Sequence, residues 1–136
     1  MRRLVILATA LFGLFLLWVI FQADTGRDTV FFRFARSVPL GDKIGHFFLY
    51  GFLAFGLHLS LRLRCFRLRG WKLPTGPTIL LFVVVAEEFS QAFIPYRTLD
   101  AGDLIADVLG VVLFTWLTCL PFFRRRFGLP ENNPAS

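Results

Sequence analysis

The chain has 136 residues, enough for one domain, and 56% of them are apolar. Soluble globular domains usually reach about 45–50%. The net charge of +6 does not indicate nucleic-acid binding, because the basic residues lie in short segments between long apolar stretches rather than along one soluble face. The composition therefore excludes a nucleic-acid-binding domain and favours a membrane protein.

Four apolar stretches approach the length of about 20 residues that crosses a bilayer. The first is longer than the apolar core of a secretory signal peptide, so we expect it to be retained. The stretches lie at about 4–22, 44–61, 78–94 and 104–120. We therefore predict one all-α membrane domain over 1–136, a small bundle of four transmembrane helices, with a flexible tail at 127–136.

The connections between these stretches differ in charge. The first contains 30–36, where aromatic residues stand beside arginines, as in a short segment that lies on the membrane surface. The second, 62–76, contains five basic residues and no acidic one. The termini and the second connection together hold ten Lys and Arg, against five in the first and third connections. Since basic residues favour the cytoplasmic side, we expect both termini in the cytoplasm.

Acidic residues concentrate around the third and fourth apolar stretches. Five of the nine acidic residues of the chain are Glu87, Glu88, Asp100, Asp103 and Asp107. An ionisable residue inside a membrane span is energetically costly, and by default it marks a functional site. We therefore expect these carboxylates to face the interior of the bundle rather than lipid.

Helical spacing places the polar residues on three faces. These faces are Glu87, Glu88 and Gln91 on the third helix, Asp100, Asp103, Asp107 and Gly110 on the fourth, and Asp42, His46 and Tyr50 on the second. At about 1.5 Å per residue, all three faces lie in the outer half of the membrane. We predict that they meet in a polar pocket open to the outside, where Lys43 and Arg97 offset part of the negative charge. Gly110 leaves room for another helix to approach closely.

Two motifs resemble those of the VanZ-like family of small multi-pass bacterial membrane proteins. The first consists of Asp42-Lys43, His46-Phe47 and Tyr50, and the second of Glu88, Gln91, Phe93, Pro95, Arg97, Asp100, Asp103 and Gly110. Asp107 stands where the family pattern has Asn. The resemblance covers Pro39 to about Leu120. It implies a cell-envelope protein of the bacterial plasma (inner) membrane that influences susceptibility to teicoplanin-type glycopeptides.

Several functions stay open for the predicted pocket. The first is binding of a lipid-linked envelope component or a lipophilic glycopeptide. The binding residues would be Asp42, Lys43, His46, Tyr50, Glu87, Glu88, Gln91, Arg97, Asp100, Asp103 and Asp107. We expect membrane lipids as partners, no nucleic acid and no cofactor, and an oligomer is compatible with the sequence.

The alternative is a membrane-embedded enzyme. In it His46 and either Glu88 or Asp103 would act as general base and acid on a lipid-linked substrate. A metal-assisted variant would use His46, Glu88, Asp103 and Asp107 as ligands. Transport ranks last, because the carboxylates gather at one level instead of forming a path across the membrane.

Overall fold

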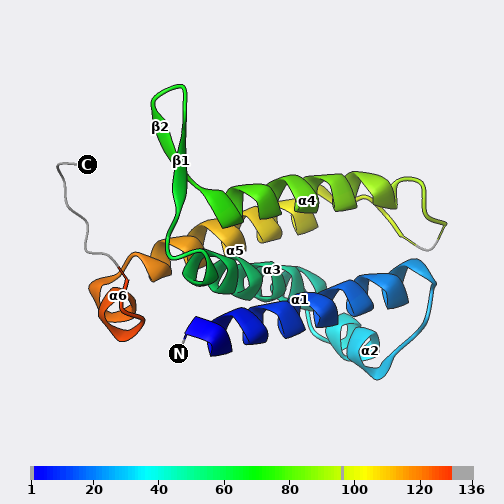
Figure 1. Ribbon diagram of the computed structural model, residues 1–136. Coiled ribbons are helices and arrows are strands. Elements are labelled where there is room, and N and C mark those ends of the chain that lie inside the picture. Colours follow the sequence, from blue (N-terminus) through cyan, green and yellow to red (C-terminus); the bar gives the residue numbers. More distant parts are fainter. Residues whose placement is uncertain (1, 96, 130–136) are drawn as a thin grey trace.

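The computed structural model of the chain describes residues 2–95 and 97–129 (Figure 1). These residues are mostly helical, with one small two-stranded sheet. In chain order the elements are α1 (Arg2–Asp24), α2 (Val30–Ser37), α3 (Gly41–Ser60), β1 (Cys65–Leu68), β2 (Trp71–Pro74), α4 (Thr75–Gln91), α5 (Ala101–Thr118) and α6 (Pro121–Arg126). The prediction of an all-α chain is confirmed except for the two-stranded sheet, and the four long helices correspond to the four apolar stretches.

Length and composition support two of the four predicted transmembrane helices. In the part of the chain that the structure describes, α1 and α5 have the length and apolar character to cross a membrane. By contrast, α3 carries Asp42 and Lys43 in its first turn and contains two histidines, and the 17-residue α4 contains Glu87 and Glu88. These polar residues shorten the apolar part of both helices. Length and composition therefore assign two candidate spans rather than four.

Helix ends differ from the predicted ones by a few residues, because local capping decides them. The α4 helix ends at Gln91, before Pro95 is reached. The α5 helix begins earlier than predicted, because the Asp100 side chain caps it by accepting a hydrogen bond from the Gly102 N–H at 2.7 Å. In the predicted tail, Leu129 donates a backbone hydrogen bond to the Arg124 carbonyl, and 130–136 lie outside the described residues.

The second connection forms a β-hairpin, which the sequence patterns did not predict. Strands β1 and β2 are antiparallel and are joined by a two-residue turn at Arg69 and Gly70. Both turn residues have positive φ, 49° and 88°, as tight hairpin turns of the mirror-image type require. The hairpin is tied to the bundle at its base, where the Thr75 N–H donates to the Arg64 carbonyl at 2.9 Å.

Helix α3 lies at the centre of the bundle and contacts α1, α2, α4 and α5, most closely α5 (Figure 1). The start of α1, the hairpin and α6 lie at one end, which we call the basic end. The α2 helix and the loop between α4 and α5 lie at the other end. The buried apolar core runs between these helices and consists of Leu16, Tyr50, Ala54, Leu80, Val84 and Val111.

Two glycines allow the close contact between α3 and α5. A Cβ atom built on Gly110 of α5 would overlap the backbone carbonyl oxygen of Phe47, and one on Gly51 of α3 would lie 2.6 Å from the Phe114 ring. Backbone cannot move aside as a flexible side chain can. The expectation that Gly110 permits close helix packing is therefore confirmed.

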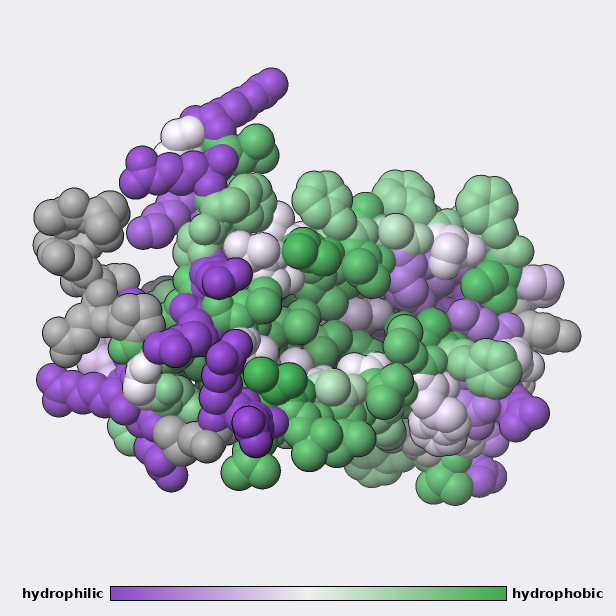
Figure 2. All heavy atoms as spheres, in the orientation of Figure 1, coloured by the Kyte–Doolittle hydropathy of each residue, from purple (hydrophilic) through white to green (hydrophobic). Residues whose placement is uncertain are grey.

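The surface of the bundle is apolar in the middle and polar at both ends (Figure 2). Most residues of α1 face outward, and its buried residues are Leu16, Val19 and Gln22. Large side chains such as Leu14 (63% exposed) and Phe82 (75% exposed) lie open on α1 and α4. A continuous exposed apolar area of this kind marks an interaction with a membrane or a partner.

We expect Gly110→Ala to destabilise the fold by about 1–3 kcal/mol, because the added methyl group overlaps the Phe47 backbone. Thermal unfolding of the purified protein measures this loss. The matched control is Gly45→Ala on α3, where an added Cβ meets nothing within 4 Å. That change should raise stability by up to about 1 kcal/mol, since Ala favours helices. Equal stability of the two variants would contradict the packing described for Gly110.

Candidate functional site

All the predicted binding residues lie at the end of the bundle opposite the basic end. Helix α3 contributes Asp42, Lys43, His46 and Tyr50; α4 contributes Glu87, Glu88 and Gln91; the following loop contributes Arg97 and Asp100; and α5 contributes Asp103 and Asp107. Hydrogen bonds and ion pairs connect most of them, and the pair of His46 and Asp107 lies beside this network, with His46 4.0 Å from Asp103. We call the whole set the polar cluster. The three helical faces inferred from spacing meet at this end of the bundle.

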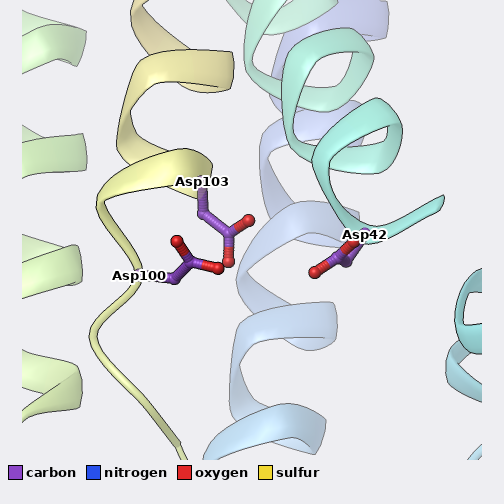
Figure 3. Close-up of side chains that lie close together, drawn as sticks. All are labelled: Asp42, Asp100 and Asp103. Atoms are coloured by element: carbon purple, nitrogen blue, oxygen red, sulfur yellow. The ribbon is translucent and has the colours of Figure 1, made fainter. Parts of the chain in front are cut away.

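Lys43 joins α3 to the start of α5. Its Nζ donates to Asp100 Oδ2 at 2.6 Å and to Asp103 Oδ1 at 2.8 Å, and it lies 3.8 Å from Asp42 Oδ2. Figure 3 shows Asp100 and Asp103 side by side, with Asp42 facing them from the start of α3. The hydrogen bonds from Lys43 and from the Gly102 backbone hold the pKa of the Asp100 carboxyl below its usual value.

His46 pairs with the most deeply buried carboxylate of the cluster. Its Nδ1 lies 3.1 Å from Asp107 Oδ1, and Asp107 has no exposed surface. An ionised carboxylate only accepts hydrogen bonds, so this contact places a proton on Nδ1 and leaves Nε2 without one in the neutral ring. Nε2 is 4.0 Å from Asp103 Oδ2, which is beyond a hydrogen bond.

Gln91 connects the two adjacent glutamates of α4. Its Nε2 donates to Glu87 at 3.1 Å and to Glu88 at 3.0 Å. Glu88, 2% exposed, also accepts a hydrogen bond from the Asp100 backbone N–H at 2.8 Å. The end of α4 is therefore fixed to the residue that caps α5.

Glu87 is the carboxylate of α4 that reaches toward α3. Its Oε2 accepts a hydrogen bond from the Tyr50 hydroxyl at 3.4 Å, and its Oε1 accepts one from Arg97 Nη2 at the same distance. Arg97 donates to Glu87 through Nη2, so this contact is not bidentate. Both permanently charged bases of the cluster, Lys43 and Arg97, are thus already paired with carboxylates.

A cavity of about 380 Å³ lies beside the polar cluster, between α1, α2 and α3. Its walls are mainly apolar and include Leu16 and Val19 of α1, Val38 after α2, and Ile44 and Phe48 of α3. At one side it reaches Asp42, His46, Tyr50, Glu87 and Arg97. The sequence analysis predicted a pocket among the second, third and fourth long helices. It did not predict that α1 and α2 line the cavity. For α2, the available signal was the alternation of aromatic residues and arginines at 30–36.

The predicted metal ligands do not converge. His46 pairs with Asp107, whereas Glu88 is bound to Gln91 and the Asp100 backbone. Among the described residues, a different set, Asp42, Asp100 and Asp103, has carboxylate oxygens within 4.8 Å of one another (Figure 3). Lys43 already neutralises part of that set. The metal-assisted mechanism stays a prediction without geometric support.

Comparison with known proteins gives one relative of note. An uncharacterized protein of the fission yeast Schizosaccharomyces pombe is 34% identical over 116 residues, which are 83% of this chain. The aligned region covers 65% of the length of that relative. No family model matches the chain, and no solved structure matches it.

These findings correct two expectations. The resemblance to VanZ-like proteins is not supported, because no family model matches. The placement in a bacterial plasma membrane is contradicted by a relative from a eukaryote. The expectations tied to that family, including an influence on glycopeptide susceptibility, lose their basis. What remains is the polar cluster and the cavity beside it.

We expect Lys43→Met to lower the thermal stability of the protein, because it leaves Asp100 and Asp103 without their shared partner. The change should depend on pH. A carboxyl group with a lowered folded-state pKa stabilises the protein above its unfolded-state pKa, and this contribution disappears as pH falls through the folded-state value. The melting temperatures of wild type and variant should therefore converge at acid pH. A constant difference across pH would contradict the pairing, and Arg27→Met, an exposed base, serves as the control.

Proposed function

We propose that this chain is an integral membrane protein that binds an amphiphilic lipid in the cavity between α1, α2 and α3. The observation that carries the proposal is the form of this cavity, in which apolar walls lead to a cluster of polar and charged side chains. Its volume of about 380 Å³ lies within the range of about 300–1,000 Å³ typical of small-molecule sites.

The exposed surface of the helices supports a place within the bilayer. On α1, the outward residues Leu4, Leu11 and Leu17 are each 58–68% exposed. In water such a surface would promote aggregation, whereas in lipid it is the expected exterior. Trp18 and Trp116 are exposed near opposite ends of the apolar band, where aromatic side chains commonly mark the two membrane interfaces.

All four long helices cross the membrane in this proposal, including α3 and α4, whose composition alone does not qualify them. Their polar residues are turned toward one another and paired, which removes most of the cost of placing them at membrane depth. The larger number of Lys and Arg at the basic end supports an orientation with both termini in the cytoplasm. The cavity and the polar cluster then lie in the opposite half of the bilayer.

The charge of the polar cluster favours a particular kind of lipid head group. Six carboxyl groups share this region with Lys43, Arg97 and His46, and both fixed cations are already bound to carboxylates. An anionic head group would compete with these internal pairs. A head group that carries hydroxyl or amino groups can instead donate hydrogen bonds to the carboxylates, so we infer a polyhydroxylated or amino-containing lipid.

We expect Gly45→Phe to reduce the lipid that copurifies with the protein, because Gly45 lines the cavity and an added Cβ meets open space there. Native mass spectrometry of the detergent-solubilised protein measures the bound lipid. Val112→Phe is the control, since Val112 is 56% exposed on α5 and does not line the cavity. Equal lipid content in both folded variants would overturn the proposal.

An enzymatic function is the second candidate, and the pair of His46 and Asp107 favours it. The contact fixes the positions of the Asp107 carboxylate and the His46 ring, and His46 lines the cavity. In the neutral ring, Nε2 is the nitrogen without a proton. A histidine held in this way by a buried carboxylate can accept a proton from a hydroxyl group or water. Glu88, by contrast, is engaged in structural hydrogen bonds, which makes it the weaker of the acids considered.

We expect His46→Gln to abolish any lipid conversion while lipid binding persists. The measurement is mass spectrometry of a total yeast lipid extract after incubation with the reconstituted protein. His58→Gln provides the control, because His58 is buried at the other end of α3 against Thr118. If wild type and His46→Gln leave the same lipid profile, the protein binds lipid without converting it.

A further inference from the structure

The β-hairpin has one apolar and one basic face. In its register Phe66 pairs with Leu73 and Leu68 pairs with Trp71, and directly opposed residues lie on the same face of a sheet. These four side chains are all apolar. The pairs Arg67–Lys72 and Cys65–Pro74 lie on the opposite face. Both charged side chains of the strands are thus on one face, and the four large apolar side chains are on the other.

The apolar face of the hairpin has little covering from the rest of the described chain. Trp71 is 74% exposed, Leu68 55% and Phe66 37%. An isolated hairpin of two strands is only marginally stable in water, and an exposed apolar face lowers its stability further. The sequence therefore implies an apolar environment against this face.

The direction of the hairpin indicates what that environment is. The hairpin extends away from the bundle, roughly across the direction in which the long helices run (Figure 1). In Figure 2, green atoms lie on the side of the hairpin toward the apolar band, and purple atoms lie on the opposite side and at the tip. If the helices cross a bilayer, the hairpin lies along its surface with the apolar face inward.

We propose that the hairpin is an interfacial anchor that docks on the anionic cytoplasmic leaflet of the membrane. Phe66, Leu68 and Trp71 would enter the boundary between head groups and acyl chains, where tryptophan is favoured. Arg67 and Lys72 would contact lipid phosphates from the other side. This inference rests on the proposed membrane location but not on the lipid cavity, which lies at the opposite end of the bundle.

The positive charge of the hairpin and of the nearby α6 favours an anionic membrane leaflet as the partner of the apolar face. The segment 62–72 contains five basic residues and no acidic one, and Arg124, Arg125 and Arg126 of α6 lie at the same end of the bundle. Basic clusters next to membrane spans bind anionic lipids. An uncharged protein surface would satisfy the apolar face but would offer no counter-charge to Arg67, Arg69 and Lys72 of the hairpin.

Tryptophan fluorescence of the full chain tests the anchor. Trp18→Phe with Trp116→Phe leaves Trp71 as the sole tryptophan, and both replaced residues are exposed, at 53% and 58%. The protein is reconstituted in vesicles of phosphatidylcholine and phosphatidylglycerol at three to one, with acyl chains brominated near the head group. We expect quenching of Trp71 by the bromines, a blue-shifted emission and protection from aqueous iodide.

Two further variants make the result specific. Arg67→Gln, Arg69→Gln and Lys72→Gln together should reduce the quenching to the level seen in vesicles of phosphatidylcholine alone. A variant that keeps only Trp116, on the lipid-facing side of α5, reports whether the bundle itself is in the bilayer.

Three outcomes would overturn the anchor. Iodide-accessible Trp71 beside a bromine-quenched Trp116 would mean that the bundle lies in the membrane and the hairpin does not. Trp71 protected from both iodide and bromine would mean that protein covers the apolar face. Quenching that is unaffected by the three Gln substitutions would remove the role of anionic lipid.

Discussion

The polar end of this bundle depends on carboxylates of one segment finding partners on another. Glu88 of α4 accepts a hydrogen bond from the Asp100 backbone, Asp100 accepts one from Lys43 of α3, and Lys43 also holds Asp103 of α5. Glu88 is buried, so removing its partner would leave a carboxylate uncompensated in the interior, whereas the partly exposed pairs of Lys43 each contribute less. The network therefore constrains the relative position of α3, α4 and α5. The side of the site formed by these helices is fixed by charge, whereas the α1 side is shaped by apolar packing.

Close packing and charge pairing reinforce each other along α5. Asp107 and Gly110 are three positions apart in the sequence, so they occupy the same face of the helix. Gly110 brings the α5 backbone against Phe47 of α3, and this short distance lets Asp107 reach His46, the residue before Phe47. A larger side chain at residue 110 would separate the helices and leave Asp107 buried without its partner. The orientation of the histidine is thus a consequence of a glycine that takes no part in the polar cluster.

Local sequence patterns predicted what depends on one helix at a time. Apolar continuity located the long helices, and the spacing of Asp103, Asp107 and Gly110 placed them on one face. The cavity was beyond such reasoning, because periodicity tells which side of α1 and α2 is apolar and not what packs against it. The hairpin depends on pairing between Leu68 and Trp71 across a turn, and no helical pattern reveals it. The family resemblance failed for a related reason: polar residues spaced three or four apart arise on any helix with a buried polar face, so the spacing is not specific to one family.

Helix α1 packs chiefly against α3, yet it supplies one complete wall of the cavity through Leu16 and Val19. Leu16 also belongs to the buried core, whereas Val19 does not, and neither residue takes part in the polar contacts that join α3, α4 and α5. These polar contacts and the α1 wall of the cavity are thus assigned to different helices. Under the proposed function, a substitution at Val19 would change the size of the molecule that the cavity accepts while the polar cluster stays intact, so the ligand can change without loss of the fold.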